Sequence, residues 1–336
     1  MRVVIIGAGP GGIVMGKRLL ESEFDDLVIL EASDDVGGTW NLNRYPGCEC
    51  DVQSAMYSFT FEFKPDWSKP YGRQPEILDY MRGVADKYGI TPHCRFDDRV
   101  VSATWNEHGA CWTVRTESGA SFEAEILVSA VGMLTKPVWP DIEGIETFEG
   151  VIFHSARWDW SHDVAGQRIA VIGSAASAVQ FVPEIRKTAA QVHLFQRTPN
   201  WVLPKEDTPY TEAELEAFRN DPTPLHIIRG EIEDRMNRGM TFAVEELLVQ
   251  SEKYGLAAIS VVEDPDVRAR LTPDHPFGCK RPLLSNDYFP AFNEPNLELV
   301  TDPIERITAD AVVTVDGSER QVDMIVLATG FAATEF

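Results

Sequence analysis

The stretch RVVIIGAGPGGIVMGKRLL (residues 2–20) decides the fold. The stretch over residues 2–6, which is apolar after Arg2, is typical of a buried strand, and a helical apolar pattern begins at residue 13. Between them stand three glycines of the pattern G-x-G-x-x-G: Gly7, Gly9 and Gly12. The first glycine makes a tight turn, the second lets a pyrophosphate approach the backbone, and the third allows close helix–strand packing. The stretch therefore predicts a strand, a turn and a helix around a dinucleotide phosphate.

The strand that follows this helix offers a partner for the ribose. Residues 27–31 (LVILE) form a second apolar run that ends in Glu31. A carboxylate in this place accepts hydrogen bonds from ribose hydroxyls, and the N terminus of the helix offers N–H groups to the phosphates. A glycine turn alone can be purely structural. The complete order of strand, turn, helix, strand and acid favours dinucleotide binding over that alternative.

A second copy of this arrangement begins with the strand RIAVIG, which ends at Gly173, and closes with the strand QVHLFQR, which ends at Arg197. Twenty-four residues separate Gly7 from Glu31, and the same number separates Gly173 from Arg197. A guanidinium in the place of the acid can grip a 2′-phosphate in two contacts, and Thr198 adds a hydroxyl donor. We therefore expect the first site to prefer a nucleotide without a 2′-phosphate and the second site to prefer NADP(H).

The second turn differs from the first at two glycines. Residues 173–178 read Gly-Ser-Ala-Ala-Ser-Ala, with alanine in the places of the second and third glycines. Ala178 affects only the packing of the helix, whereas the methyl group of Ala175 stands where a pyrophosphate approaches. We expect the second nucleotide to be bound by Gly173, Ser174, Ala175 and Ser177. The alternative is a degenerate repeat that binds no nucleotide.

Strand-like segments follow each copy and complete the fold prediction. They cover residues 100–105, 111–116 and 124–132 after the first copy, and residues 304–307, 311–315 and 322–330 after the second. Helical patterning interrupted by proline occupies residues 211–271. The predicted class is α/β, with two Rossmann-like dinucleotide-binding domains, their β-meanders and a helical insertion, which is the two-dinucleotide flavoprotein fold.

Composition limits the partners and the compartment. The 336 residues carry 30 Lys and Arg against 53 Asp and Glu, a net charge of −23, which disfavours nucleic acid and acidic membranes as partners. No apolar run reaches the length of a membrane span. The five cysteines form no even framework, so we expect reduced thiols and a cytoplasmic location. Cys48 and Cys50 have no further ligands nearby for zinc, so no metal site is expected, and they lack the spacing of a redox pair beside a flavin.

Two longer motifs carry a family resemblance. Residues 148–159 (FEGVIFHSARWD) follow the order F-x-G-x-x-x-H-x-x-x-W and then Asp. A second pattern joins Gly37-Gly38-x-Trp40 to Tyr45-Pro46-Gly47 and Asp51. With these motifs the chain resembles the class B flavin monooxygenases, and the type I Baeyer–Villiger monooxygenases in particular. Residues 195–201 (FQRTPNW) and 277–282 (FGCKRP) are also similar to family segments. The related amine- and sulfur-oxidising flavin monooxygenases usually lack the Trp of the first motif.

The resemblance implies FAD and NADP(H) as cofactors. In this family NADPH reduces FAD, O2 then gives a C4a-peroxyflavin, and one oxygen atom enters next to a ketone carbonyl to form an ester or lactone. Arg281 matches the catalytic arginine of the family, and Asp51 matches the acid that positions it. Lys280 would join Arg197 on the 2′-phosphate. The remaining residues expected to contact a cofactor are Gly38, Thr39, Trp40, Asp51, Tyr57 and Arg281.

The motif FEGVIFHSARWD lies between the two nucleotide-binding copies, where we expect a linker. In the family this linker is thought to couple domain motion to catalysis, so His154 is not expected to act as a chemical base. The alternative, that His154 is only a packed interface residue, stays open. The expected segments are an FAD-binding domain (1–145), the linker (146–165), an NADP-binding domain (166–210 and 272–320), the helical insertion (211–271) and a return to the FAD domain (321–336).

Three functions stay open from the sequence. The first is an FAD- and NADPH-dependent ketone monooxygenase acting with O2. The second is an S- or N-oxygenating enzyme of the same fold, which Trp158 and the motif through Asp51 disfavour. The third is a flavin-binding fragment without oxygenase activity. Relatives continue past the turn Ala328–Phe331, and this chain stops at Phe336, so we expect it to lack the C-terminal part of the family.

Overall fold

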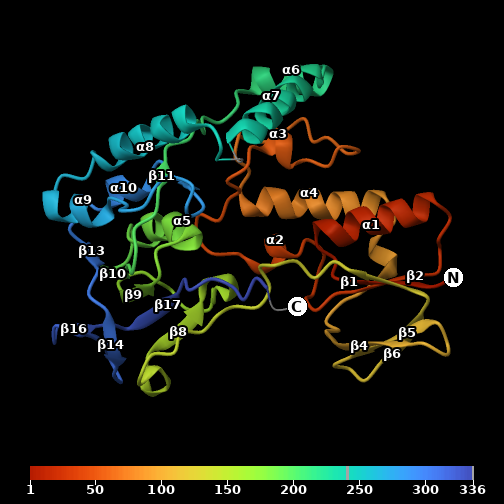
Figure 1. Cartoon of the computed structure of the whole chain (residues 1–336), viewed down its shortest axis with the longest axis horizontal. Coiled ribbons are helices and arrows are strands. Elements are labelled where there is room, and N and C mark those ends of the chain that lie inside the picture. The colour runs from red at the N-terminus through yellow and green to blue at the C-terminus, as the bar shows by residue number, and fades with distance from the viewer. Residues whose placement is uncertain (240–241, 335–336) are drawn as a thin grey trace. The chain divides into compact units, whose positions relative to one another are not determined.

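The structure of the chain, a computed structural model, describes residues 1–239 and 242–334. It divides into two units. The first comprises Met1–Arg44, Gln74–Pro137 and the residues from Phe331, and the second comprises Tyr45–Arg73 and Val138–Gly330. Each unit contains a main parallel sheet, helices and an antiparallel meander, and the second unit also contains a short parallel pair of strands (Figure 1). The predicted α/β class with two Rossmann-like units is thereby confirmed.

The parallel sheet of the first unit has the strand order β3-β2-β1-β7. Its strands are β1 (Val3–Ile6), β2 (Leu27–Leu30), β3 (Cys94–Arg95) and β7 (Ile126–Ser129). The helices of this unit are α1 (Pro10–Glu21), α2 (Thr39–Leu42), α4 (Gln74–Lys87) and the 3-10 helix η1 (Thr91–His93). Figure 1 shows α1 and α4 lying together on one side of the sheet.

The opposite face of this sheet is covered by the meander β4 (Val100–Asn106), β5 (Cys111–Thr116) and β6 (Ser121–Ala124). Val4 and Leu30 of the sheet pack against Val114 of the meander, while Ile29 lies under Gly16 of α1. Successive side chains of a strand point to opposite faces, so a sheet covered on both faces needs an unbroken apolar run. This explains why residues 3–6 are apolar without alternation.

The sheet of the second unit repeats this order and adds a strand, giving β13-β10-β9-β17-β8. Its strands are β8 (Val151–His154), β9 (Arg168–Ile172), β10 (Gln191–Phe195), β13 (Leu297–Val300) and β17 (Met324–Leu327), all parallel. Helix α5 (Ala176–Ile185) packs Phe181 and Val182 on the face that carries Val171 and Leu194. The meander β14 (Ile304–Ile307), β15 (Ala311–Thr314) and β16 (Glu319–Gln321) covers the other face through Val312.

Both meanders contain a strand that the sequence analysis did not anticipate. These strands are β6 in the first unit and β16 in the second. Both are short, half of β6 and all of β16 are polar, and they pair antiparallel with the middle strand of their meander. Their sequences, SFEA and ERQ, are too short to show an apolar pattern, so pairing with a neighbour decides their conformation.

The expected linker is partly a strand. Within residues 146–165 the chain forms β8 and the 3-10 helix η3 (Ser155–Arg157), and the 3-10 helix η2 (Ile145–Thr147) precedes them. Strand β8 pairs in parallel with β17, with Phe153 opposite Val326. Gly150 stands just before it, and a Cβ there would lie 2.5 Å from the carbonyl oxygen of Asp323 and 2.6 Å from the Phe148 ring. Glycine therefore permits this strand to enter the sheet beneath the Phe148 side chain.

The expected helical insertion is present in the second unit. Its helices are α6 (Glu212–Asn220), α7 (Thr223–Gly239), α8 (Glu245–Ile259) and α9 (Pro265–Leu271). Thr211 and Glu214 form a reciprocal capping box at the start of α6, and Asp264 caps α9. Residues 240 and 241 of this predicted segment, and residues 335 and 336 of the predicted return to the FAD domain, lie outside the described residues.

The remaining elements of the second unit are short. They are α3 (Ser54–Tyr57), α10 (Tyr288–Ala291) and the parallel pair β11 (Val202–Leu203) and β12 (Leu283–Leu284). Tyr45–Arg73 belongs to this unit although it lies inside the range 1–145 expected for the FAD-binding domain. Throughout residues 1–239 and 242–334, every helix is too short or too polar to cross a membrane.

Candidate active site

The expected site residues fall into two groups, one in each unit. The first unit contains Gly7, Gly9, Gly12, Glu31, Gly38, Thr39 and Trp40, and the second contains Asp51, Tyr57, Gly173, Ser174, Ala175, Ser177, Arg197, Thr198, Lys280 and Arg281. Each group is described below within its own unit.

The first glycine turn joins β1 to α1. Gly7 adopts a φ of +102°, and a Cβ there would lie 2.5 Å from the carbonyl oxygen of Ala130. A Cβ on Gly12 would lie 2.0 Å from the carbonyl oxygen of Gly7. Gly9 is the N-cap of α1, and no side chain caps this helix. The backbone N–H groups at the start of α1 therefore face a turn free of side chains, which suits a phosphate.

Glu31 follows β2 and is only 7% exposed. Its carboxylate accepts from the Ala8 N–H at 2.7 Å and from the N–H and hydroxyl of Ser33 at 2.8 and 2.7 Å. The carboxylate thus ties the glycine turn to the end of β2. Two carboxylate oxygens offer about four acceptor sites, so this arrangement leaves capacity for a ribose hydroxyl.

The first part of the second family pattern, Gly37-Gly38-x-Trp40, lies beside the first turn. Gly38 approaches Gly9 so closely that a Cβ on Gly38 would lie 2.9 Å from the Gly9 Cα. Thr39 and Trp40 begin α2, and the Trp40 carbonyl accepts from the Gln74 side chain at 2.5 Å. The structure therefore brings together Gly9, Gly38 and the start of α2. This proximity is what we expect if both motifs contribute to one binding site.

The second turn, between β9 and α5, repeats the geometry of the first. Gly173 has a φ of +104°, and a Cβ there would lie 2.4 Å from the carbonyl oxygen of Ala328. Ala175 is the N-cap of α5 and has a φ of −89°, which alanine adopts without strain. Ala178, in the place of Gly12, is fully buried. The Ser174 carbonyl accepts from the Asn200 side chain at 3.0 Å. The two alanines are therefore compatible with the turn.

Cationic residues gather at the end of β10. Arg197 and Thr198 are exposed there, and the Thr198 hydroxyl accepts from the Lys280 ammonium at 2.8 Å. Lys280 comes from a segment 82 residues away. The structure thus joins the two segments that the sequence analysis assigned to the 2′-phosphate.

Arg281 pairs with Asp51. Its guanidinium lies 2.6 Å from an Asp51 carboxylate oxygen, with side chains 71% and 28% exposed. The two residues are 230 positions apart, and the pair links the loop before α3 to the segment before β12. An arginine that donates to one carboxylate in this way keeps further N–H groups for an incoming anion.

Tyr57 is the last residue of α3. The insertion fixes the C-terminal end of this helix through Arg229 of α7, which donates to the carbonyls of Ala55, Met56 and Ser58 at 3.1, 3.0 and 2.9 Å. These carbonyls have no partners inside so short a helix. The insertion therefore shapes the surroundings of Tyr57.

His154 ends β8 and is 2% exposed. Its Nδ1 accepts from the Ala156 N–H at 3.1 Å, and burial lowers its pKa, so the neutral ring is favoured. Trp158 packs edge-on against Phe153 with ring centres 5.1 Å apart and also contacts Phe181 of α5. The His and Trp of this motif therefore pack inside the second unit. Their expected role in coupling domain motion stays a prediction.

Sequence reasoning missed several residues that build the second group. Gln180 of α5 donates to the Glu49 carbonyl at 3.0 Å and accepts from the Tyr45 hydroxyl at 3.0 Å. Glu49 also pairs with Lys69 and Lys205. Tyr45 belongs to the second family pattern, so the pattern could have drawn attention to Glu49, which stands between Gly47 and Asp51. The partners of Glu49 lie far along the chain and left no local signal.

The C-x-C thiols Cys48 and Cys50 are buried and are not joined in a disulfide. Burial raises the pKa of each to about 12. Disulfide exchange needs a thiolate, and a thiol with so high a pKa stays protonated at neutral pH. The expectation that the pair has no redox role stays a prediction.

Comparison with known proteins identifies the family of the chain. A family model described as pyridine nucleotide-disulphide oxidoreductase matches residues 4–237. A Baeyer–Villiger monooxygenase of Pseudomonas aeruginosa is 39% identical over 99% of this chain, and one of Streptomyces coelicolor is 40% identical over 100%. The chain spans 64% and 65% of the lengths of these two relatives.

A solved structure is similar to this chain in both fold and sequence. The structure of OTEMO in complex with FAD and NADP is 31% identical in sequence and superposes with a TM-score of 0.87, covering 99% of this chain and 72% of that one. The two glycine turns, the Asp51–Arg281 pair and these similarities lead to one assignment: the chain belongs to the Baeyer–Villiger monooxygenases, within the pyridine nucleotide-disulphide oxidoreductase family.

Proposed function

We propose that this chain binds FAD and NADP(H) and acts as an NADPH-consuming flavoprotein monooxygenase, which inserts one atom of O2 next to a ketone carbonyl to give an ester or lactone. The observation that carries the proposal is the juxtaposition of two neighbouring cations with separate partners. Lys280 contacts Thr198 beside Arg197, and Arg281 contacts Asp51. A phosphate site and a site for developing negative charge thus adjoin in one segment.

The residues present fit both cofactors. In the first unit Gly7, Gly9 and Gly12 leave the start of α1 open to a pyrophosphate, and Glu31 stands at the end of β2 for a ribose. Gly38, Thr39 and Trp40 would add contacts to FAD. In the second unit the β9–α5 turn with Gly173, Ser174, Ala175 and Ser177 would hold NADP(H), with its 2′-phosphate on Arg197, Thr198 and Lys280. Tyr57 is proposed as a further cofactor contact.

When bound, the flavin accepts hydride from NADPH and activates O2. Arg281 would stabilise the negative charge that develops on the ketone oxygen as oxygen adds to the carbonyl carbon. Asp51 would orient the guanidinium, because a carboxylate at 2.6 Å restricts a side chain that solvent otherwise leaves mobile. The OTEMO complex, which contains FAD and NADP, supports the cofactor assignment. We further propose a cytoplasmic location, since all five cysteines, each within the described residues, are free thiols.

The test separates reduction from oxygenation in the FAD-loaded enzyme. Arg281→Ala should leave reduction by NADPH within a few-fold of the parent rate, while ester formation falls by about 10²–10³-fold, the usual effect of removing one donor to an oxyanion. Asp51→Ala should show a milder loss of the same kind. Arg306→Ala removes an exposed arginine paired with Glu305 and serves as the matched control. Parental ester formation by Arg281→Ala would show that this arginine has no such role.

A further inference from the structure

We propose that Glu49, Lys69, Lys205 and Asp207, here called the four-charge network, position the Asp51–Arg281 pair. The proposal concerns residues that act through the pair, and it rests on the function proposed above. The four residues of the network lie in two segments of the second unit. The segment Tyr45–Arg73 also contains Asp51, and the segment Val138–Gly330 also contains Arg281. The network is therefore placed to set the distance between Asp51 and Arg281.

The network is enclosed and balanced in charge. The side chains of Lys205, Lys69, Asp207 and Glu49 are only 4%, 11%, 13% and 15% exposed. Lys69 lies 2.8 Å from Glu49 and 2.6 Å from Asp207, and Lys205 pairs with Glu49 and lies 3.4 Å from Asp207. Each cation thus contacts both anions. Water screens such enclosed charges weakly, so the four side chains constrain one another closely.

One side of the network controls the loop that carries Asp51. Glu49 stands two residues before Asp51, and its backbone N–H and carbonyl both bond to the Gln180 side chain at 3.3 and 3.0 Å. The Cys50 N–H donates to the Gly72 carbonyl at 3.0 Å. The loop is therefore tied to α5 and to its own segment just before Asp51, and the Glu49 carboxylate adds the link to Lys205.

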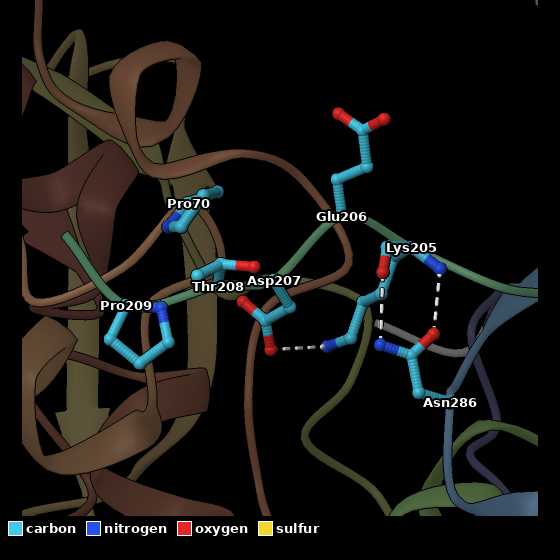
Figure 2. Close-up of a pocket in the computed structure, with 7 residues that line it drawn as sticks. All are labelled: Pro70, Lys205, Glu206, Asp207, Thr208, Pro209 and Asn286. Atoms are coloured by element: carbon cyan, nitrogen blue, oxygen red, sulfur yellow. Dashed lines mark hydrogen bonds and ion pairs between the residues drawn. The ribbon is translucent and has the colours of Figure 1, made fainter.

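The other side of the network controls the segment that carries Arg281. Lys205 follows β11, which pairs with β12, and β12 begins two residues after Arg281. Figure 2 shows Lys205 and Asn286 bonded in both directions, with the Asn286 side chain accepting from the Lys205 N–H and donating to its carbonyl, each at 2.9 Å. The same view shows the ion pair from Lys205 to Asp207. Both of these residues line a cavity of about 650 Å³.

Three ion pairs therefore bridge the same two segments, and they differ in exposure. Asp51–Arg281 has one largely exposed partner, so on its own this pair does little to hold the two segments together. Glu49–Lys205 and Lys69–Asp207 are enclosed, and removing one partner of either pair leaves an uncompensated charge. The enclosed pairs are the ones able to fix the spacing, and Glu49–Lys205 contains the network residue next but one to Asp51, while Arg281 stays accessible.

The key variant is Glu49→Gln/Lys205→Met, which removes one anion and one cation and leaves Lys69 paired with Asp207. In the FAD-loaded holoenzyme it should reduce ester formed per NADPH by about 10- to 100-fold, the scale of a misplacement near 1 Å, while reduction by NADPH changes little. Lys205→Arg, which keeps the charge, should recover most of the yield. Lys64→Met, which removes a partly buried cation paired with Asp66 on the same segment but outside the network, should match the parent.

A mutant cycle tests whether the network acts through the pair. In an Asp51→Ala background the double substitution should cause no further loss of ester yield, because the pair it positions is already absent. Additive losses would overturn the proposal and leave the network as a purely structural feature.

Hydrogen exchange gives a readout that does not depend on the reaction. Amides of residues 48–52 should exchange at least about 10-fold faster in the double variant than in the parent or in Lys64→Met, because local opening becomes easier. Unchanged exchange together with unchanged ester yield would refute the positioning role. If the parent formed no ester from any ketone, the proposed function would fail, whereas faster exchange would still support control of the Asp51 loop by the network.

Discussion

Arg197→Ala in the second nucleotide site should selectively weaken binding of NADP⁺. Arg197 follows β10, where Glu31 stands in the first repeat, and its neighbour Thr198 already contacts Lys280. If the guanidinium contacts the 2′-phosphate, its loss affects only the nucleotide that carries this phosphate. NAD⁺ should then bind the variant and the parent with the same affinity within about twofold.

The magnitude follows from the kind of contact and its exposure. A hydrogen bond to a charged group contributes about 1.5–3 kcal/mol, and two contacts from one guanidinium add incompletely, giving about 2–4 kcal/mol. Arg197 is exposed at the end of its strand, so water screens the interaction and the lower end applies. We therefore expect a loss of about 2 kcal/mol, which is about 30-fold in Kd. Lys280 should retain part of the phosphate affinity.

The assay is calorimetric titration of the FAD-loaded protein with NADP⁺ and with NAD⁺. Lys280→Met should cause a similar selective loss, and the double variant should bind the two nucleotides almost equally. Lys187→Ala removes an exposed lysine paired with Glu184 and controls for the change in net charge. The reasoning fails if Arg197→Ala weakens NAD⁺ and NADP⁺ by the same factor, or if the parent does not discriminate between them.

Three further predictions concern the second unit. Gly150→Ala should lower the free energy of unfolding by about 1–3 kcal/mol in urea titrations, because its Cβ would lie 2.5 Å from the Asp323 carbonyl oxygen. The control Gly230→Ala, on an open helix face, should not lower the free energy of unfolding. Equal effects of the two substitutions would contradict this account. At pH 8 an alkylating reagent should modify exposed Cys279 in the folded protein and spare Cys50, as mass spectrometry can show; equal modification would contradict burial of Cys50. Because burial raises the pKa of Cys50 from 9.0 to about 12, its contribution to stability should be complete below pH 9 and be lost as pH rises toward 12.

The positions of several strands in the two repeats were predicted correctly from local sequence patterns. Strand β14 coincides with the expected residues 304–307, and the expected strand over residues 168–173 contains β9. The prediction of β9 succeeded because a sheet covered on both faces requires an almost unbroken apolar run, which is a local signal, and β14 (IERI) has apolar residues at both of its ends. The strands β6, β16 and β8 were not anticipated, since each depends on pairing with a neighbour that local patterning does not reveal.

The candidate site shows the same division. The glycine turns were predicted because a φ near +100° at Gly7 and Gly173 demands glycine wherever the turn occurs. The pairing of Asp51 with Arg281 was expected only through the family resemblance, because 230 residues separate them. The roles of the site residues stay predictions until the variants above are measured.

The sequence by itself determined the α/β class and the duplication, and it predicted a nucleotide preference for each site, because glycine spacing, apolar runs and the acid-to-arginine exchange from Glu31 to Arg197 act over about 30 residues. Only the tertiary structure decided that the motif around Gly150 enters a sheet as β8, that Tyr45–Arg73 belongs to the second unit, and that Glu49 meets Lys205. The physical reason is that enclosed charges and paired strand edges are stabilised by partners distant in sequence. Local sequence patterns do not indicate which distant partners come into contact.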